Sequence, residues 1–168
     1  FANSFQDTKR IERKFIMGQG VGILANSSML ANGFRPIHRK RQVCSIYYDD
    51  VDFNCLRDNV DGNPFRDKLR VRYYDDVFDN AKIEIKHKRN FFGYKSTIPL
   101  TGSTSVNDLI QRTSRWVTNN ISNPLLPVSI VEYQRTYLMY KSIRATIDVQ
   151  VRSSRIFNSQ KIPSTFRD

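Results

Sequence analysis

An alternation of charged and apolar residues at positions 65–74 constrains this chain more than any other feature. The ten residues read Phe-Arg-Asp-Lys-Leu-Arg-Val-Arg-Tyr-Tyr, with a cation at every second position after the first. Side chains alternate between the two faces of an extended strand, so Arg66, Lys68, Arg70 and Arg72 would share one face. Like charges on one face repel each other, and a fold that holds them together usually binds a strong anion there. The segment therefore predicts a β-strand that binds a phosphate chain.

Length and composition indicate one folded, basic domain over residues 1–168. The formal net charge is +11 and 12% of the residues are aromatic, which argues against a disordered basic tail. The isoelectric point is near 9.9. A folded basic domain favours a polyanionic partner, which leaves nucleic acid, nucleotides, polyphosphate and anionic membrane surfaces as classes.

Cysteine content and hydropathy exclude several other classes. Cys44 and Cys55 are too few for a disulfide framework or a zinc site, which favours a reducing, cytoplasmic compartment. No apolar run reaches the roughly 18 residues of a membrane span, and the N-terminus lacks a signal-peptide profile. Because the chain begins with Phe1 and ends at Asp168 without a recognisable terminal element, we expect a fragment truncated at its C-terminus.

The same alternation predicts further strands along the chain. Strands are expected at residues 10–17, 42–48, 82–88, 91–99, 128–140 and 143–151. Paired as a hairpin, segments 65–74 and 82–88 would form one basic sheet surface. In segment 143–151 the residues alternate between two faces. The apolar face is formed by Ile143, Ala145, Ile147, Val149 and Val151, and the polar, charged face by Arg144, Thr146, Asp148, Gln150 and, just beyond the segment, Arg152.

Helical periodicity is confined to a few segments. Residues 105–121 place apolar side chains at helical spacing, and Ser105 is a suitable N-cap. Short helical turns are expected at 27–31 and 53–57. The Arg-Lys-Arg run at 39–41 is interpreted as a solvated loop.

Two interpretations fit strands with one apolar and one charged face. A solvated β-sandwich would alternate in the same way, but its surface usually mixes both signs of charge. Here arginine is prominent, and its planar guanidinium binds phosphate oxygens in pairs. We therefore favour a phosphate-binding sheet.

Six segments, taken in order, resemble VTC domains, the polyphosphate-polymerase branch of the triphosphate tunnel metalloenzymes. The resemblance covers nearly the whole chain. The segments are Arg10–Phe15 (Arg-Ile-Glu-Arg-Lys-Phe), Ser45–Asp49 (Ser-Ile-Tyr-Tyr-Asp), Arg66–Tyr74, Ile83–Lys86 (Ile-Glu-Ile-Lys), Tyr133–Thr136 (Tyr-Gln-Arg-Thr) and Arg144–Asp148 (Arg-Ala-Thr-Ile-Asp).

The resemblance implies a mainly β (α+β) fold, an antiparallel β-barrel tunnel of about eight strands with a basic lumen and a few external helices. It also implies transfer of the γ-phosphoryl group of ATP to polyphosphate, with Mn²⁺ or Mg²⁺. ATP, triphosphate and polyphosphate are the expected partners, without sequence-specific nucleic acid. A membrane-embedded partner or domain in the parent protein, and a place at the cytoplasmic face of a membrane, fit the same resemblance.

The motif match and the charged faces of the expected strands together indicate the site residues. The expected catalytic residues are Arg70, Arg72, Lys86 and Arg135. The expected phosphate-binding residues are Arg10, Lys14, Arg66, Lys68, Lys88, Tyr133 and Arg144. The expected metal ligands are Glu12, Glu84 and Asp148, because hard cations prefer carboxylate oxygens. Each of these acids could equally be the ion-pair partner of a neighbouring cation.

Other functions stay open at this point. A triphosphatase of the same fold would use water in place of the acceptor phosphate. A non-catalytic module that binds polyphosphate or RNA is also open, because the late strand of Leu-Glu-Ile-Lys type that supplies the family's metal-binding Glu is not found before Asp168. RNA binders stack bases on exposed aromatic residues. Tyr47, Tyr48, Tyr73 and Tyr74 are interpreted as strand packing.

Overall fold

The computed structural model describes residues 12–18, 20–157 and 160–163 and contains one large antiparallel sheet with three helices. The seven strands follow each other in the spatial order β4-β3-β2-β1-β5-β6-β7. The strands are β1 (Arg35–Asp49), β2 (Phe65–Tyr74), β3 (Val77–Arg89), β4 (Phe92–Leu100), β5 (Leu126–Tyr140), β6 (Ile143–Phe157) and β7 (Gln160–Pro163); the helices are α1 (Val21–Ala31), α2 (Asn54–Val60) and α3 (Val106–Asn120).

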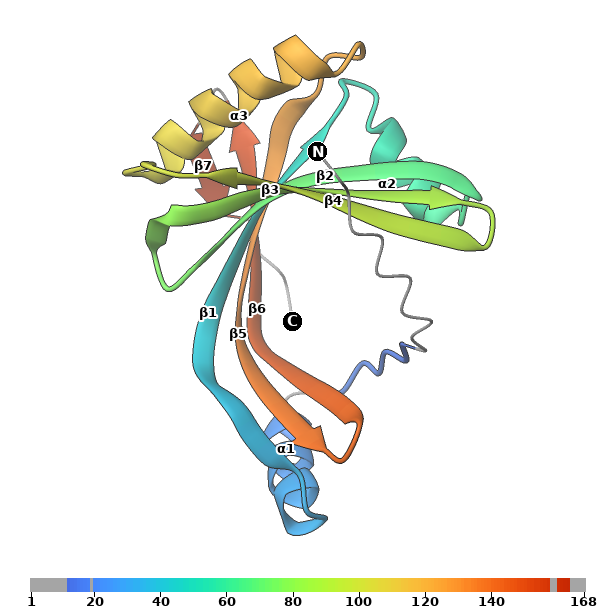
Figure 1. The fold of residues 1–168 in the computed structure, drawn as a ribbon, viewed down its shortest axis with the longest axis vertical. Helices are drawn as coiled ribbons and strands as arrows, with labels where there is room; N and C mark the ends of the chain where they lie inside the picture. Colours follow the sequence, from blue (N-terminus) through green and yellow to red (C-terminus); the bar gives the residue numbers. More distant parts are fainter. Residues whose placement is uncertain (1–11, 19, 158–159, 164–168) are drawn as a thin grey trace.

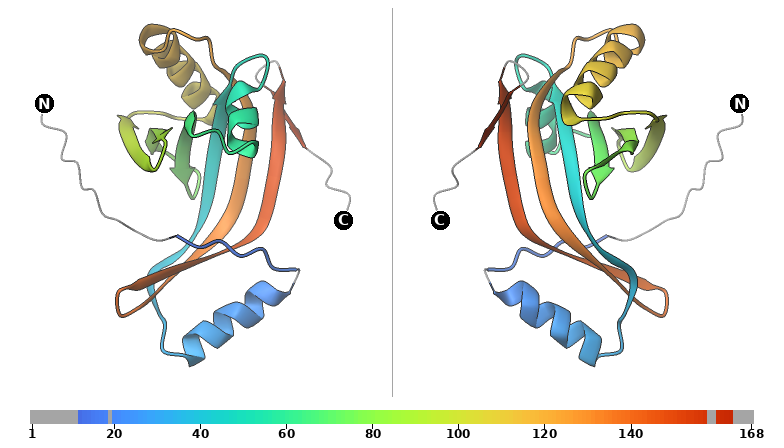
Figure 2. Two further views of the ribbon diagram at one scale, coloured as in Figure 1. Left: turned by 90° about the vertical axis from the view of Figure 1, so that its right-hand side faces the viewer. Right: turned by 90° about the vertical axis from the view of Figure 1, so that its left-hand side faces the viewer.

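The sheet is curved like the letter C (Figure 1). Strands β2, β3 and β4 form the upper arm, and the far end of the β5–β6 hairpin forms the lower arm. Helix α3 lies above the upper arm and α1 below the lower arm, so both helices cover the outside of the curve (Figures 1 and 2). We call the helix-covered side the outer face and the opposite side the inner face.

The hydrophobic core lies between the outer face and α3. Val71 and Ile83 from the sheet and Leu109 from the helix are fully buried. Helix α3 begins as its sequence predicts, since the side chain of Ser105 accepts a hydrogen bond from the amide of Asp108 at 3.1 Å. Its buried positions recur at helical spacing, which buries one face against the sheet. None of the described helices is long and apolar enough to cross a membrane.

The mainly β, antiparallel fold class is confirmed, but the described strands do not close into a barrel. Strands β4 and β7 are the two edges, and no described strand joins them. The strand expected at 10–17 is not formed in its described part, where residues 12–17 lie exposed outside regular structure. Since none of the described strands lies between these edges, the described part of the inner face is a trough and not an enclosed tunnel.

Two further expectations are corrected. The run 39–41, expected as a loop, belongs to β1, because this strand continues its pairing with β5 as far as Arg35. In β6, the apolar alternation changes side at Gln150, whose φ of 54° lies in the left-handed region. This residue falls beside a break in the β5–β6 register, as a β-bulge does, so the side chain of Arg152 shares a face with Glu132.

The predicted pairing of segments 65–74 and 82–88 is confirmed, since β2 and β3 form an antiparallel hairpin. Its two-residue turn, Asp75 and Asp76, has φ values of 53° and 56°, which matches the twist of an antiparallel pair. Asp75 also accepts a hydrogen bond from the amide of Gln42 on β1, which fixes the turn against the neighbouring strand.

Candidate phosphate-binding face

The upper arm of the inner face is densely cationic. Cross-strand partners share a face in an antiparallel pair, so the register between β2, β3 and β4 lines up four successive rows of side chains. These rows carry eight cations: Arg66 and Lys88; Lys68, Lys86 and Lys95; Arg70; and Arg72 and Lys82. Within these described rows, Glu84 is the one acidic side chain.

Glu84 lies at the centre of this cluster and is bound by three of its cations. Its carboxylate accepts hydrogen bonds from Arg70, at 2.8 Å to Nε, and from Lys95. Arg72 lies 3.9 Å from the same carboxylate. One buried acid thus holds three cations together and offsets part of their mutual repulsion.

The electrostatics of Glu84 follow from two opposing effects. Burial raises the pKa of its carboxyl, but the hydrogen bonds and charges of Lys95, Arg70 and Arg72 outweigh burial and lower the pKa below its ordinary value. Glu84 is therefore ionised at neutral pH, and the cluster keeps its large excess of positive charge.

Arg70 and Arg72 are oriented by hydroxyl groups from neighbouring strands. Arg70 donates to the hydroxyl of Tyr47 at 3.4 Å. Arg72 donates to Ser45 at 3.3 Å and to Tyr133 at 3.4 Å. Strands β1 and β5 thereby fix the direction of two guanidinium groups on β2, and such fixed groups can receive a phosphate without large rearrangement.

Three lysines of the upper arm are more exposed than Arg70 and Arg72. Lys82, Lys86 and Lys95 are exposed, and Lys68 lies 5.0 Å from the centroid of the Tyr47 ring. A hollow of about 280 Å³ opens beside them and is lined by Arg72, Tyr74, Lys82, Glu84, Lys95 and Thr97. Exposed ammonium groups around oriented guanidinium groups are well suited to a flexible chain of phosphates.

Two predicted residues, Arg135 and Arg144, lie on the inner face but outside the rows of β2, β3 and β4. Arg135 on β5 is held by both oxygens of Asp148 on β6, at 2.6 and 2.7 Å. Its guanidinium also lies 5.0 Å from the centroid of the Tyr133 ring, which connects it to Arg72 through Tyr133. Arg144 lies one residue from the β5–β6 turn, opposite Met139, at the far end of the lower arm.

The remaining predicted residues are not brought into the cluster. Glu12 and Lys14 are exposed in segment 12–18, and Arg10 lies outside the described residues. Sequence reasoning missed Lys95, Ser45 and the position of Lys82, because their roles come from cross-strand pairing and not from a motif. The alternation in segment 82–88 is the signal that could have included Lys82.

The expected metal ligands do not converge. Glu84 and Asp148 engage both carboxylate oxygens with cations. Among the described residues, no group of three His, Cys, Asp or Glu side chains could hold a metal ion. Glu84 and Asp148 act here as ion-pair partners, and both their assignment as metal ligands and the dependence on Mn²⁺ or Mg²⁺ stay predictions.

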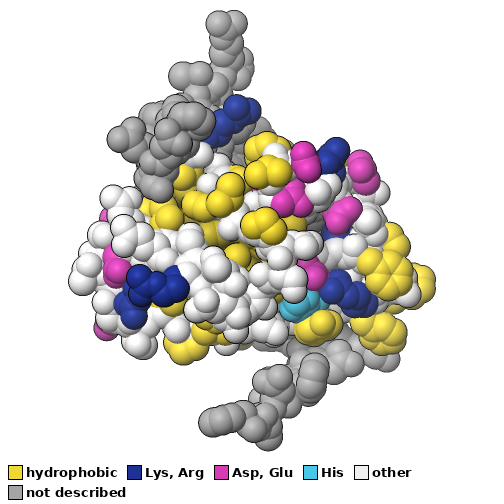
Figure 3. Space-filling view, turned by 90° about the horizontal axis from the view of Figure 1, so that it is seen from above, with side chains coloured by type: hydrophobic (Ala, Val, Ile, Leu, Met, Phe, Trp, Pro, Cys, Tyr) yellow, Lys and Arg dark blue, Asp and Glu magenta, His cyan; other side chains and the backbone are white. Residues whose placement is uncertain are grey.

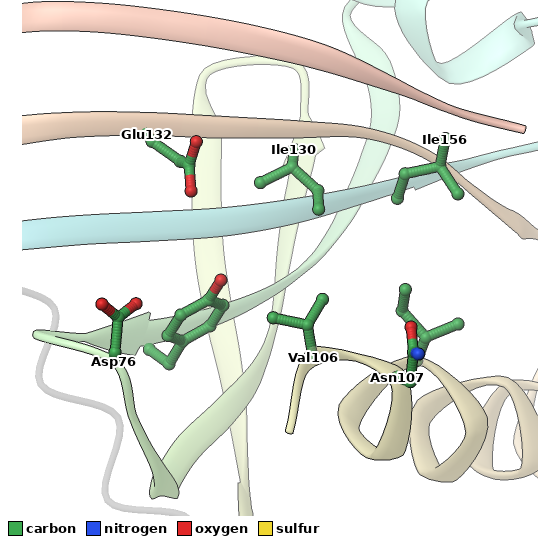
Figure 4. A pocket seen from close by; sticks show the side chains of 8 residues that line it. Asp76, Val106, Asn107, Ile130, Glu132 and Ile156 are labelled. Atoms are coloured by element: carbon green, nitrogen blue, oxygen red, sulfur yellow. The ribbon is translucent and has the colours of Figure 1, made fainter. Parts of the chain in front are cut away.

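The outer face has a different character. Seen from the α3 side, the described residues mix hydrophobic, acidic and basic side chains without one continuous basic patch (Figure 3). A hollow of about 240 Å³ between α3 and the sheet is lined in part by Asp76, Glu132 and Ile130. Figure 4 shows the two carboxylates pointing into the same space. Two carboxylates disfavour phosphate, so the inner face is the candidate site.

The fold and the site together define a curved antiparallel sheet protein that concentrates cations on one face. The family model of the VTC domain matches residues 9–168, so the chain belongs to the VTC domain family. Its place in the triphosphate tunnel superfamily is consistent with that family, which is associated with phosphotransferase activity of the polyphosphate-polymerase type. No curated protein matches the chain in sequence.

Proposed function

We propose that this domain transfers the γ-phosphoryl group of ATP to the end of a polyphosphate chain held on the inner face. The observation that carries the proposal is the cluster of eight cations around Glu84, in a chain that belongs to the VTC domain family. Phosphoryl transfer depends on alignment and on charge stabilisation more than on a protein nucleophile. Oriented arginines beside exposed lysines can supply both.

In the proposed reaction, a terminal oxygen of polyphosphate attacks the γ-phosphorus of ATP. The bond between that phosphorus and the β–γ bridging oxygen breaks, ADP leaves with the electron pair, and a new phosphoanhydride bond forms. The attacking oxygen is ionised at neutral pH, so the protein needs no general base. Arg70 and Arg72 would bind the transferring group, and Lys82, Lys86 and Lys95 would hold the two phosphate chains.

The roles of the other predicted residues follow from their places. Arg135, tied to Asp148 and next to Tyr133, would stabilise the side of the cluster facing β5. Lys68, Arg66 and Lys88 would extend the binding surface toward the β3–β4 turn. His38 and His87 have no part in this chemistry.

The test incubates the chain with ATP, polyphosphate primer and Mn²⁺ and resolves the products on a gel. Lengthened chains support the proposal, whereas free phosphate alone would indicate a triphosphatase that uses water as the acceptor. Binding of polyphosphate without either product would leave a non-catalytic binding module. Arg70→Ala should abolish lengthening, and Asp67→Asn, on the opposite face of the same strand, is the matched control.

A further inference from the structure

The bend of the inner face carries aromatic rings on which a polyphosphate chain cannot stack. Tyr74 and Tyr133 both flank Val43 across the β2–β1 and β1–β5 ladders, so the three side chains share the inner face. Tyr137 lies four residues after Tyr133 on β5, and therefore on the same face, opposite His38. All three tyrosines are partly exposed. Polyphosphate offers only oxygens and no planar group for these rings.

The strand register is interrupted at several points around these residues. The register breaks between Arg72 and Tyr74, between His38 and Arg41, and between Glu132 and Gln134, all close to the aromatic cluster. Register breaks of this kind bend strands and redirect side chains, and they are common beside functional sites.

Arg41 adds an unsatisfied donor to the same place. Its guanidinium lies 5.8 Å from the centroid of the Tyr74 ring, and its Nε is buried without a hydrogen-bond partner. Arg70, Arg72 and Arg135, by contrast, each donate from Nε to a neighbouring side chain. A buried donor without a partner carries a cost that a bound acceptor would remove.

The aromatic cluster is continuous with the cation cluster. Arg72 donates to the hydroxyl of Tyr133 and also lies beside Glu84, so it belongs to both. Tyr74 lines the hollow of about 280 Å³ together with Lys82 and Lys95. A ligand that joins a planar base to a chain of phosphates would reach both clusters at once.

We propose that Tyr74, Tyr137 and Arg41 form a nucleobase subsite, which seats the base of a nucleoside triphosphate whose phosphates lie on the upper arm. The inference rests on the proposed function, since it assigns a place to the donor nucleotide. The base stacks on a tyrosine ring, and Arg41 donates to an acceptor on the base or ribose. The subsite distinguishes the nucleotide donor from the polyphosphate acceptor, which binds through the cations alone.

The test compares ATP with tripolyphosphate, which carries as many phosphates but no base. Tyr74→Leu and Tyr137→Leu keep most of the apolar bulk and remove the ring. By calorimetry, each variant should weaken ATP binding about tenfold, because stacking on an aromatic ring contributes on that order per base, and should change tripolyphosphate binding less than about twofold. Tyr94→Leu is the control, since this exposed ring stacks on His87 on the outer face.

Each other outcome has a definite meaning. Equal weakening for both ligands, or for neither, would overturn the base subsite and leave the tyrosines with a packing role. Tighter binding of single-stranded oligoadenylate than of ATP, with the same dependence on Tyr74 and Tyr137, would overturn it in favour of RNA. Failure of the unsubstituted chain to bind tripolyphosphate would overturn the proposed function itself. Thermal unfolding of each variant shows whether it is folded, and Arg41→Gln supplies a second test that removes no core side chain.

Discussion

Neutralising Glu84 should lower stability and raise anion affinity at the same time. In Glu84→Gln, the amide keeps one oxygen acceptor but loses the charge that holds Arg70, Arg72 and Lys95 together. The side chain of Glu84 is 8% exposed and those of Arg70 and Arg72 are 27% and 12% exposed. The lost charge interactions therefore lie in a partly desolvated site, where water screens them less. Lys95, at 50%, contributes little because solvent screens it.

The magnitudes follow from these contacts. A hydrogen bond between charged groups contributes about 1.5–3 kcal/mol, and the substitution removes about one such interaction, so the free energy of unfolding should fall by roughly 1.5–3 kcal/mol. A phosphate about 5 Å from Glu84 is repelled by roughly 1–3 kcal/mol for a dielectric constant between about 80 and 20. Since the site is open to solvent, we expect the lower part of that range and an increase of about tenfold in tripolyphosphate affinity.

Urea unfolding and calorimetry with tripolyphosphate measure the two effects. The matched control is Asp67→Asn, which also removes a carboxylate paired with an arginine, Arg89, but from the outer face. The control should leave the affinity nearly unchanged. An unchanged stability together with a lower affinity in Glu84→Gln would refute the reasoning, and it would point to Glu84 as the ligand of a metal carried by the phosphates.

Three further predictions concern pH, charge and packing. The pKa of Glu84 is lower in the folded state than its ordinary value of 4.5, so its contribution to stability is complete above about pH 4.5 and is lost as the pH falls through the folded-state pKa. In Glu84→Gln, the free energy of unfolding should therefore fall less steeply as the pH is lowered into the acid range. Arg72→Ala should weaken tripolyphosphate binding by about ten- to a hundredfold in calorimetry, whereas Arg144→Ala, at the far end of the lower arm, should have little effect; equal losses would contradict the placement of the site. Leu109→Ala should cost about 2–5 kcal/mol in urea unfolding, because Leu109 is fully buried between α3 and the sheet, and a loss below about 1 kcal/mol would show that α3 does not close the core.

Much of the local structure could be predicted from the sequence. The alternation in 65–74 gives β2 residue for residue, because side chains on successive strand residues point to opposite faces and the two kinds of residue need different surroundings. Helix α3 follows from apolar spacing and the Ser105 cap. The prediction of a loop at 39–41 was wrong because it relied on the same alternation. Three consecutive cations show no alternation, yet the backbone there continues its hydrogen-bonded ladder with β5.

What the sequence by itself determined is that Arg66, Lys68, Arg70 and Arg72 share one face of a strand, because period two is a local property of the backbone. Only the tertiary structure decided what faces them. The register across β2, β3 and β4 sets Glu84 among Arg70, Arg72 and Lys95, and the bend of β1 and β5 brings Arg41 and Tyr137 to the same trough. These contacts join residues far apart in the chain, and a shift of one residue in register would turn the side chains of a strand to the other face.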